Sequence, residues 1–165
     1  MRNELAAALL LFAACSKPGV STTTAAPAPA PVQVTSGPRV VFPDGYTVQV
    51  ELAIDAETRA QGLMFRDSLR PASGMLFFFP EDGHYPFWMK NTRIPLDMIW
   101  VDANRKVAHL KSAVPPCKAD PCPSYPPNVQ ARYVLEVAGG VANQHGLKAG
   151  DQLRFEGMEN VGPRS

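Results

Sequence analysis

The sequence predicts an α+β module of mainly β structure: a single compact antiparallel barrel-like or sandwich domain with two short helices. Three observations support this fold class. Short apolar or alternating segments recur along residues 39–157 and are separated by Pro, Gly, Asp and Asn. The segments with helical spacing are short. The length of 165 residues suits one domain and a tail, because one core seldom needs more than about 150 residues.

The predicted strands are short, from three to nine residues long. The first covers residues 46–54, where apolar and polar residues alternate and β-branched residues are common. The connections between strands are too short for the crossover helices of a βαβ fold, which favours antiparallel pairing. The other expected strands are 74–79, 87–89, 96–101, 106–114, 133–137 and 152–156.

Two short helices are expected beside these strands. Asp55 can cap the first, and Gly62 tolerates the left-handed backbone that ends a helix. The second is expected over residues 141–145 and ends at Gly146. The residues that share the apolar face of the first helix are Ala56, Ala60 and Leu63.

Residues 1–14 are predicted to form a secretory signal peptide. Residues 5–14 are ten consecutive apolar residues, fewer than the roughly 20 that a membrane-spanning helix needs. The segment Phe-Ala-Ala-Cys-Ser at 12–16 resembles the cleavage box of bacterial lipoproteins, in which the Cys becomes diacylated. This resemblance predicts lipidation of Cys15. An ordinary cleaved signal, an uncleaved segment and a mis-assigned start are the alternatives.

Residues 15–38 are interpreted as the lipidated Cys and an Ala/Pro-rich tether. Residues 16–38 contain five Pro and a single charge, a composition that favours an extended chain over a packed one. We therefore expect an exported, lipid-anchored protein that faces the periplasm, with either envelope membrane as the site of the anchor. The tether is followed by the module at 39–157 and a loose C-terminal end at 158–165.

The charge balance of the module argues against nucleic acid as a partner, and its two cysteines predict a disulfide. Residues 39–165 contain 14 basic and 14 acidic residues, so no basic field is available for nucleic acid. Cys117 and Cys122 form an even pair in an exported context and predict a disulfide; free thiols or a two-thiolate metal site are the alternatives. The polar segment 81–84 is interpreted as a turn. We predict no metal and no cofactor.

Several motifs together resemble domain-of-unknown-function family 192, a family of small prokaryotic, often exported proteins. The resemblance spans about residues 45–156 and implies one compact β-rich domain, but no activity. The motifs that carry it lie at 62–69 (GLMFRDSL), 74–79 (GMLFFF), 87–92 (FWMKNT), 94–97 (IPLD), 133–136 (YVLE) and 138–151.

Two carboxylates lie in strongly apolar strands. Asp97 shares a strand face with Ile99 and Val101, and Glu136 lies beside Val134. A carboxylate in such a place needs a cation or several hydrogen-bond donors. One hypothesis is that Asp97 and Glu136 meet in a cleft and act as acid and base or hold a cation. The other is a structural Asp–Lys or Asp–Arg pair that, together with backbone hydrogen bonds, fixes the loop 91–95. The cations available nearby in sequence are Lys90, Arg66 and Arg93.

An aromatic cluster is predicted around Pro86 and Pro95, from Tyr85, Phe87, Trp88 and Trp100. These rings either line a pocket or pack in the core. Because Trp88 alternates with Phe87 and Met89, one ring set is expected to face outward. An exposed Trp88 beside Asp97 would favour a groove.

We expect a non-catalytic envelope lipoprotein that binds a ligand, with a glycan as the first candidate. Nucleophile motifs and phosphate-binding glycine loops are absent from the sequence. A hydrolase or lyase using Asp97 and Glu136 is the second hypothesis, and a structural partner-binding module is the third. The expected partners are a membrane, through Cys15, and an envelope glycan or protein. The predicted ligand-binding residues are Trp88, Lys90, Asn91, Asp97, Glu136 and Arg66.

Overall fold

The computed structural model describes residues 37–164. The predicted signal peptide, Cys15 and nearly all of the tether lie outside the described residues. None of the helices in residues 37–164 has the length and apolar character needed to cross a membrane.

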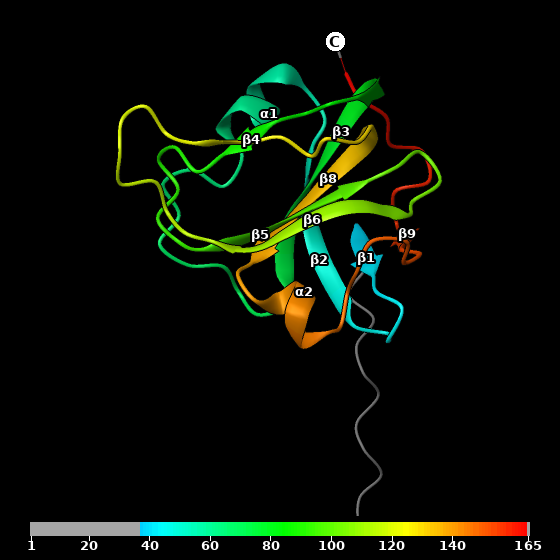
Figure 1. The fold of residues 1–165 in the computed structure, drawn as a ribbon. Coiled ribbons are helices and arrows are strands. Elements are labelled where there is room, and N and C mark those ends of the chain that lie inside the picture. Colours follow the sequence, from blue (N-terminus) through cyan, green and yellow to red (C-terminus); the bar gives the residue numbers. More distant parts are fainter. Residues whose placement is uncertain (1–36, 165) are drawn as a thin grey trace, which may run out of the picture. The chain divides into compact units, whose positions relative to one another are not determined.

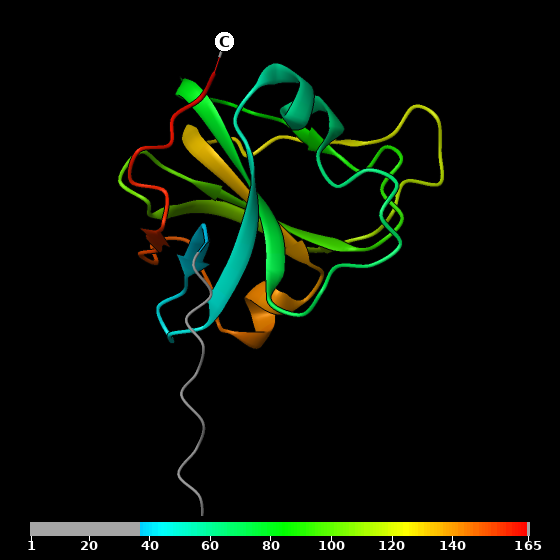
Figure 2. The ribbon, with the colours of Figure 1, turned by 180° about the vertical axis from the view of Figure 1, so that it is seen from behind.

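The protein is built on a curled sheet of seven strands (Figures 1 and 2). The strand order is β6-β5-β8-β3-β2-β1-β9. Neighbouring strands are antiparallel except β2 and β3, which are parallel. The bounds are β1 Arg39–Val41, β2 Thr47–Ala53, β3 Ser73–Gly83, β5 Leu96–Val101, β6 Val107–Val114, β8 Ala131–Ala138 and β9 Arg154–Glu156. The predicted fold class, mainly β with two short helices, is confirmed.

A second sheet has two strands, and one of them forms a wall of the pocket described below. β4 (Phe87–Trp88) pairs with β7 (Ser124–Tyr125) in antiparallel register. Cys117 and Cys122 form a disulfide with a Cα–Cα distance of 5.7 Å, as predicted. The backbone N–H of Cys117 also donates to the carbonyl of Met89. The cross-linked segment is therefore joined to the chain around β4.

The two helices cover different parts of the sheet. α1 (Ala56–Gln61) begins at Asp55, which accepts from the Thr58 backbone N–H at 2.8 Å, and ends at Gly62. This capping fixes a helix of only six residues, too short to be stable alone. α2 (Val141–Gln144) is a single turn that buries Ala142. α1 lies next to β4, and α2 lies at the other end of the sheet (Figures 1 and 2).

The core consists of two apolar clusters, one on each face of the sheet. Ile99, Val101 and Leu135 belong to the first cluster. Met98, Trp100 and Val134 belong to the second. This division follows from the alternation of side chains along β5 and β8. Since both faces are covered, all six residues of β5 are buried.

Three features differ from the sequence-based expectations. β1 and β7 are not predicted by the sequence, because each has only two or three residues and shows no periodicity. The 81–83 segment expected to be a turn belongs to the end of β3. The C-terminal end is not loose: Met158 is buried in the first core cluster, and the Arg164 backbone N–H donates to the carbonyl of Ile54.

Candidate functional site

Asp97 is fully buried, and all of its described partners are neutral donors. Its Oδ1 accepts from the backbone N–H of Ala113 at 2.6 Å and of Gly140 at 2.8 Å, and from Ser112 Oγ at 2.8 Å. Its Oδ2 accepts from the Ala142 N–H at 2.6 Å. Several hydrogen bonds of this kind satisfy a buried carboxylate without a cation. Asp97 therefore joins the end of β6 to the start of α2.

The backbone hydrogen bonds to Asp97 agree with the structural alternative, but the expected cation and the expected loop are corrected. Among the described residues, no Lys or Arg contacts the Asp97 carboxylate, and no residue of the loop 91–95 donates a hydrogen bond to it. One of its donors, Ala113, has a φ of 52°, a left-handed conformation that costs a non-glycine residue about 1–2 kcal/mol. The bond to Asp97 helps to hold this irregular point of β6 in place.

Asp97 and Glu136 lie on opposite faces of the sheet. The register of β5 and β8 pairs Asp97 with Val137 and Met98 with Glu136. Residues paired across two strands point to the same face, and the next residue along points to the other. The predicted carboxylate pair is therefore wrong, because the two groups are separated by the sheet itself.

Glu136 is buried but, unlike Asp97, has no described partner. Its exposed fraction is 4%, and within residues 37–164 no hydrogen bond or ion pair to its carboxyl group is found. The buried side-chain atom without a partner in this part of the chain is His109 Nε2, so the Glu136 oxygens are not fully sealed from solvent. Burial in this apolar environment raises the pKa of the Glu136 carboxyl to about 8, with no charged neighbour contributing. Glu136 is consequently a neutral acid at pH 7, able to donate one hydrogen bond and accept others.

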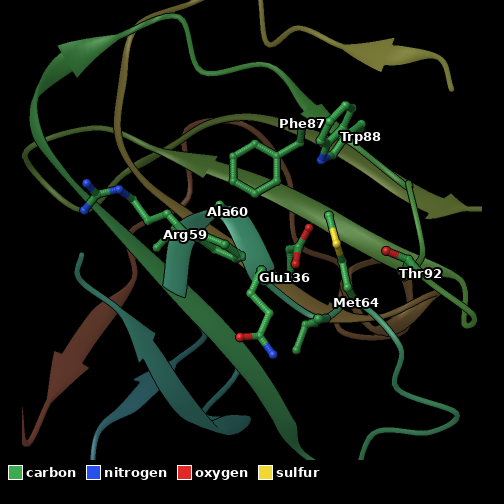
Figure 3. Close-up of a pocket in the computed structure, with 11 residues that line it drawn as sticks. Arg59, Ala60, Met64, Phe87, Trp88, Thr92 and Glu136 are labelled. Atoms are coloured by element: carbon green, nitrogen blue, oxygen red, sulfur yellow. The ribbon is translucent and has the colours of Figure 1, made fainter. Parts of the chain in front are cut away.

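Glu136 lies at the bottom of a small inner pocket (Figure 3). The pocket is lined by residues 59–64, by Phe77 of β3, by β4 and by Thr92. Its volume is about 40 Å³, enough for a few water-sized groups, since one water needs about 10–15 Å³. The pocket therefore admits a small functional group but not a sugar ring.

Gly62 contributes to the shape of the inner pocket. Its φ of 49° ends α1. A Cβ at this position would lie 3.3 Å from the Phe77 ring and 4.0 Å from Glu136 Oε2. A side chain at Gly62 would therefore strain the backbone and narrow the space beside the Glu136 carboxyl group.

An outer groove adjoins the inner pocket and shares Arg59, Ala60, Phe87 and Trp88 with it. The groove is also lined by Phe79, Tyr85 and Pro86 and has a volume of about 280 Å³. Trp88 is 51% exposed, and Lys90 Nζ lies 5.5 Å from its ring centroid. The prediction that one ring set faces outward agrees with this geometry, although Trp88 lies beside Glu136 rather than Asp97. Trp100 is instead a core residue, with its Nε1 donating to the Tyr85 carbonyl at 2.8 Å.

Arg59 is the other ionisable residue among the described pocket-lining residues. Its Nη1 donates to the carbonyls of Ile54, at 2.8 Å, and Phe78, at 3.1 Å. Its guanidinium lies 5.7 Å from the Phe79 ring centroid and points away from Glu136 in Figure 3. Arg59 therefore braces α1 against β3 and does not neutralise the buried acid.

The other predicted binding residues lie near the pocket without forming it. Arg66 is paired with Glu51, with one N–O distance of 2.7 Å, and Arg93 is paired with Asp67 at 2.9 Å. Asn91 occupies a left-handed turn, where its carbonyl accepts from the Phe65 backbone N–H at 2.8 Å. Of the predicted set, Trp88 and Glu136 line the inner pocket, Lys90 stands at the rim above Trp88, and Asp97 lies on the opposite face.

Sequence reasoning missed the contribution of α1 and the following turn, including Arg59 and Met64. Nothing in the composition of α1 marks it as a pocket wall. A signal was present in the motifs, however. The inner pocket brings together residues from 62–69, 74–79, 87–92 and 133–136, four of the segments that carry the family resemblance.

Comparison with known proteins agrees with the fold. A protein from Sinorhizobium meliloti 1021, described as a candidate transcription regulator, is 36% identical with a TM-score of 0.63; the match covers 73% of this chain and 92% of that one. A protein of unknown function from Novosphingobium aromaticivorans DSM 12444 is 33% identical with a TM-score of 0.64, covering 83% of this chain and 99% of that one. No curated protein matches.

The family assignment rests on the same region as the described module. Residues 39–155 match domain-of-unknown-function family 192, whose description reads "Uncharacterized ACR". This range runs from the first residue of β1 into β9 and includes every strand that builds the sheet and the pocket. The chain therefore belongs to domain-of-unknown-function family 192.

Proposed function

We propose that this protein is a non-catalytic ligand-binding lipoprotein of the cell envelope, and that its ligand, with a glycan as the first candidate, lies over Trp88. The observation that carries the binding role is the unpartnered Glu136 carboxyl group at the bottom of an aromatic-walled pocket. The Glu136 oxygens have no partner within the described residues and open onto this pocket, so a ligand group that enters it can exchange hydrogen bonds with them.

The outer groove supports a ligand with a flat apolar face. Phe79, Tyr85, Phe87 and Trp88 present rings along it, and sugar rings stack on such surfaces through their C–H faces. The neutral Glu136 carboxyl can exchange hydrogen bonds with a hydroxyl or amide group that reaches the inner pocket.

The alternatives have less support in the geometry. A hydrolase that uses paired carboxylates needs them about 5–10 Å apart in one cleft, whereas Asp97 and Glu136 are on opposite faces. The description of the Sinorhizobium relative would imply a role linked to DNA. Equal numbers of acidic and basic residues in 39–165 give that role no electrostatic support.

The envelope location rests on the N-terminal sequence alone. The apolar segment 5–14, the cleavage box ending at Cys15 and the Pro-rich tether together support export and lipidation. The disulfide is compatible with an oxidising compartment. A lipid-anchored module on such a tether would meet envelope polymers, which is the reason for placing glycans first among the ligands.

The proposed function is tested by thermal shift with sugars and soluble cell-wall fragments. We expect at least one fragment to raise the melting temperature of the wild-type module. Trp88→Ala should remove this shift because it deletes the more exposed of the two rings shared by the inner pocket and the outer groove.

Phe65→Ala is the matched control. Within residues 37–164, Phe65 is the other exposed large apolar residue, at 57%, and it lines neither the pocket nor the groove. The variant should keep the ligand-induced shift. If wild type, Trp88→Ala and Phe65→Ala respond equally to every fragment, the groove is not the binding site.

A further inference from the structure

We propose that the inner pocket takes a primary ammonium group of the ligand, held by the Glu136 carboxylate beside the three aromatic side chains that line the pocket. This inference rests on the proposed binding role of the cleft and names the chemical group that enters its deepest part. It would apply to an aliphatic amine, such as a lysine-type side chain, and equally to an amino sugar.

The first argument is the state of Glu136. The side chain is 4% exposed, faces the inner pocket and lacks a described partner. Asp97, in the same pair of strands, receives four hydrogen bonds from its own chain. The fold can therefore saturate a buried carboxylate with its own donors, yet it leaves Glu136 open toward a space of ligand-group size.

The second argument is the wall around Glu136. Phe77, Phe87 and Trp88 line the same pocket, and the Phe77 and Phe87 rings meet edge to face with centroids 4.9 Å apart. The negative faces of aromatic rings attract a cation most strongly where water is excluded. Together with a carboxylate, they form the surroundings that favour an ammonium group over a neutral one.

The third argument is size and access. A volume of about 40 Å³ fits an ammonium group, which is similar in size to a water molecule, but excludes a ring. The outer groove opens beside it and is lined by apolar and aromatic residues. It can accommodate the carbon chain or ring that carries the ammonium group, while the charged end reaches Glu136.

The two arginines around the site are committed to other partners, and Lys90 is a cation beside it. The Arg59 guanidinium is committed to the carbonyls of Ile54 and Phe78. Arg66, beyond Gly62, is neutralised by Glu51. The residues of β3, β4 and β5 on this face, among them Met75, Phe87 and Met98, are not titratable. Lys90 lies at the rim, over the Trp88 ring.

Binding of an ammonium group at Glu136 should depend on pH. Because burial raises the pKa of Glu136 to about 8, the acid must lose its proton when a cation binds at pH 7. The affinity for a cation should therefore rise by about tenfold for each pH unit below 8 and level off above it. Between pH 6 and pH 9 the increase is on the order of a hundredfold.

The test compares pentylammonium with pentan-1-ol by isothermal titration calorimetry at pH 6, 7, 8 and 9. We expect pentylammonium to bind at least tenfold more tightly at pH 9 and to show the rise with pH, whereas the alcohol shows none. Titrations in buffers of different ionisation enthalpy should reveal the release of nearly one proton at pH 7. This measurement uses the wild-type protein and does not depend on the folding of a variant.

Glu136→Gln keeps the size of the side chain and its ability to donate and accept hydrogen bonds, but the amide cannot ionise. It should bind both compounds equally at every pH. Two further pairs identify the carrier of the amine: Nα-acetyl-lysine methylamide against its Nε-acetylated form, and glucosamine against N-acetylglucosamine. If the lysine derivative binds more tightly than its Nε-acetylated form, the amine is carried by an aliphatic chain. If glucosamine binds more tightly than N-acetylglucosamine, the amine is carried by a sugar.

The outcomes separate the two proposals. Equal binding of pentylammonium and pentan-1-ol, or ammonium binding that is the same at pH 6 and pH 9, overturns the ammonium assignment. If neutral sugars bind and depend on Trp88 while amines do not, the proposed function stands and this inference fails. If neither amines nor cell-wall fragments bind, both fail.

Discussion

At the scale of single residues, the two buried carboxyl groups differ in what the backbone brings to them. Asp97 meets three backbone N–H groups and one hydroxyl. Glu136 meets aromatic rings and a cavity. The alternation within each strand predicts which neighbours share a face with each carboxylate, and this is confirmed. It does not predict the register between β5 and β8, which places the two groups on opposite faces.

Glu136 makes the stability of the protein depend on pH. Its carboxyl is protonated up to about pH 8 in the folded protein but ionises near 4.5 in the unfolded chain. Below 4.5 both states hold the proton. Between pH 4.5 and about pH 8, each pH unit lowers the free energy of unfolding by about 1.4 kcal/mol, because only the unfolded chain ionises. The stability that this group provides at low pH is therefore lost as the pH rises, and above 8 the loss is complete.

Glu136→Gln should remove this loss, because the amide stays neutral at every pH. The free energy of unfolding of the variant, relative to wild type, should increase from pH 5 to pH 8 and then stay constant. Urea denaturation at intervals between pH 4.5 and 9 measures the difference. A difference that is the same at pH 5 and pH 8 would mean that Glu136 ionises normally in the folded protein.

At the scale of elements, long periodic segments are predictable from sequence and very short strands are not. β2, β5 and β8 have enough alternating or apolar residues to be recognised, and Asp55 and Gly62 mark both ends of α1. β7 has two residues in a Pro-rich segment and forms only because β4 lies beside it. The wall formed by α1 could not be predicted because none of its residues is buried.

The Cys117–Cys122 disulfide lies in the segment that leads to β7, the strand that pairs with β4 of the site. Replacing Cys117 and Cys122 by Ser should lower the free energy of unfolding by about 2 kcal/mol, the chain-entropy value for so short a loop. It should also weaken ligand binding several-fold, because β7 pairs with the strand that carries Phe87 and Trp88. Chemical denaturation and calorimetry measure the two effects. Lys118→Ala, in the same exposed loop, is the control and should change neither.

Retention of full ligand affinity after loss of the disulfide would show that β4 does not need the disulfide to hold its position. Its pairing with β7 and the packing of Phe87, whose ring lies 4.9 Å from that of Phe77 and 6.0 Å from that of Trp100, would then be sufficient.

At the scale of the whole molecule, the module and its N-terminal extension have opposite physical characters. Residues 39–155 form the family domain, with buried apolar residues on both faces of the sheet. Residues 16–38 have a composition that opposes packing. The sequence predicts this division because it is visible in composition. It does not predict the pocket, which forms from side chains of α1, β3, β4 and β8 that are far apart in the chain.

The proposed anchor depends on one residue of the extension. Two acyl chains on Cys15 would hold the protein firmly on a membrane, since dual acylation supplies the two signals that stable anchoring needs. Cys15→Ser should abolish palmitate labelling in cells and move the protein from the detergent phase to the aqueous phase. The segment 5–14 is too short to replace the anchor as a spanning helix.

Because Cys117 and Cys122 are bonded to each other, their double Ser variant should keep the label. Labelling that persists in Cys15→Ser, or is missing from wild type, would contradict the lipoprotein proposal while leaving the pocket and its tests unaffected.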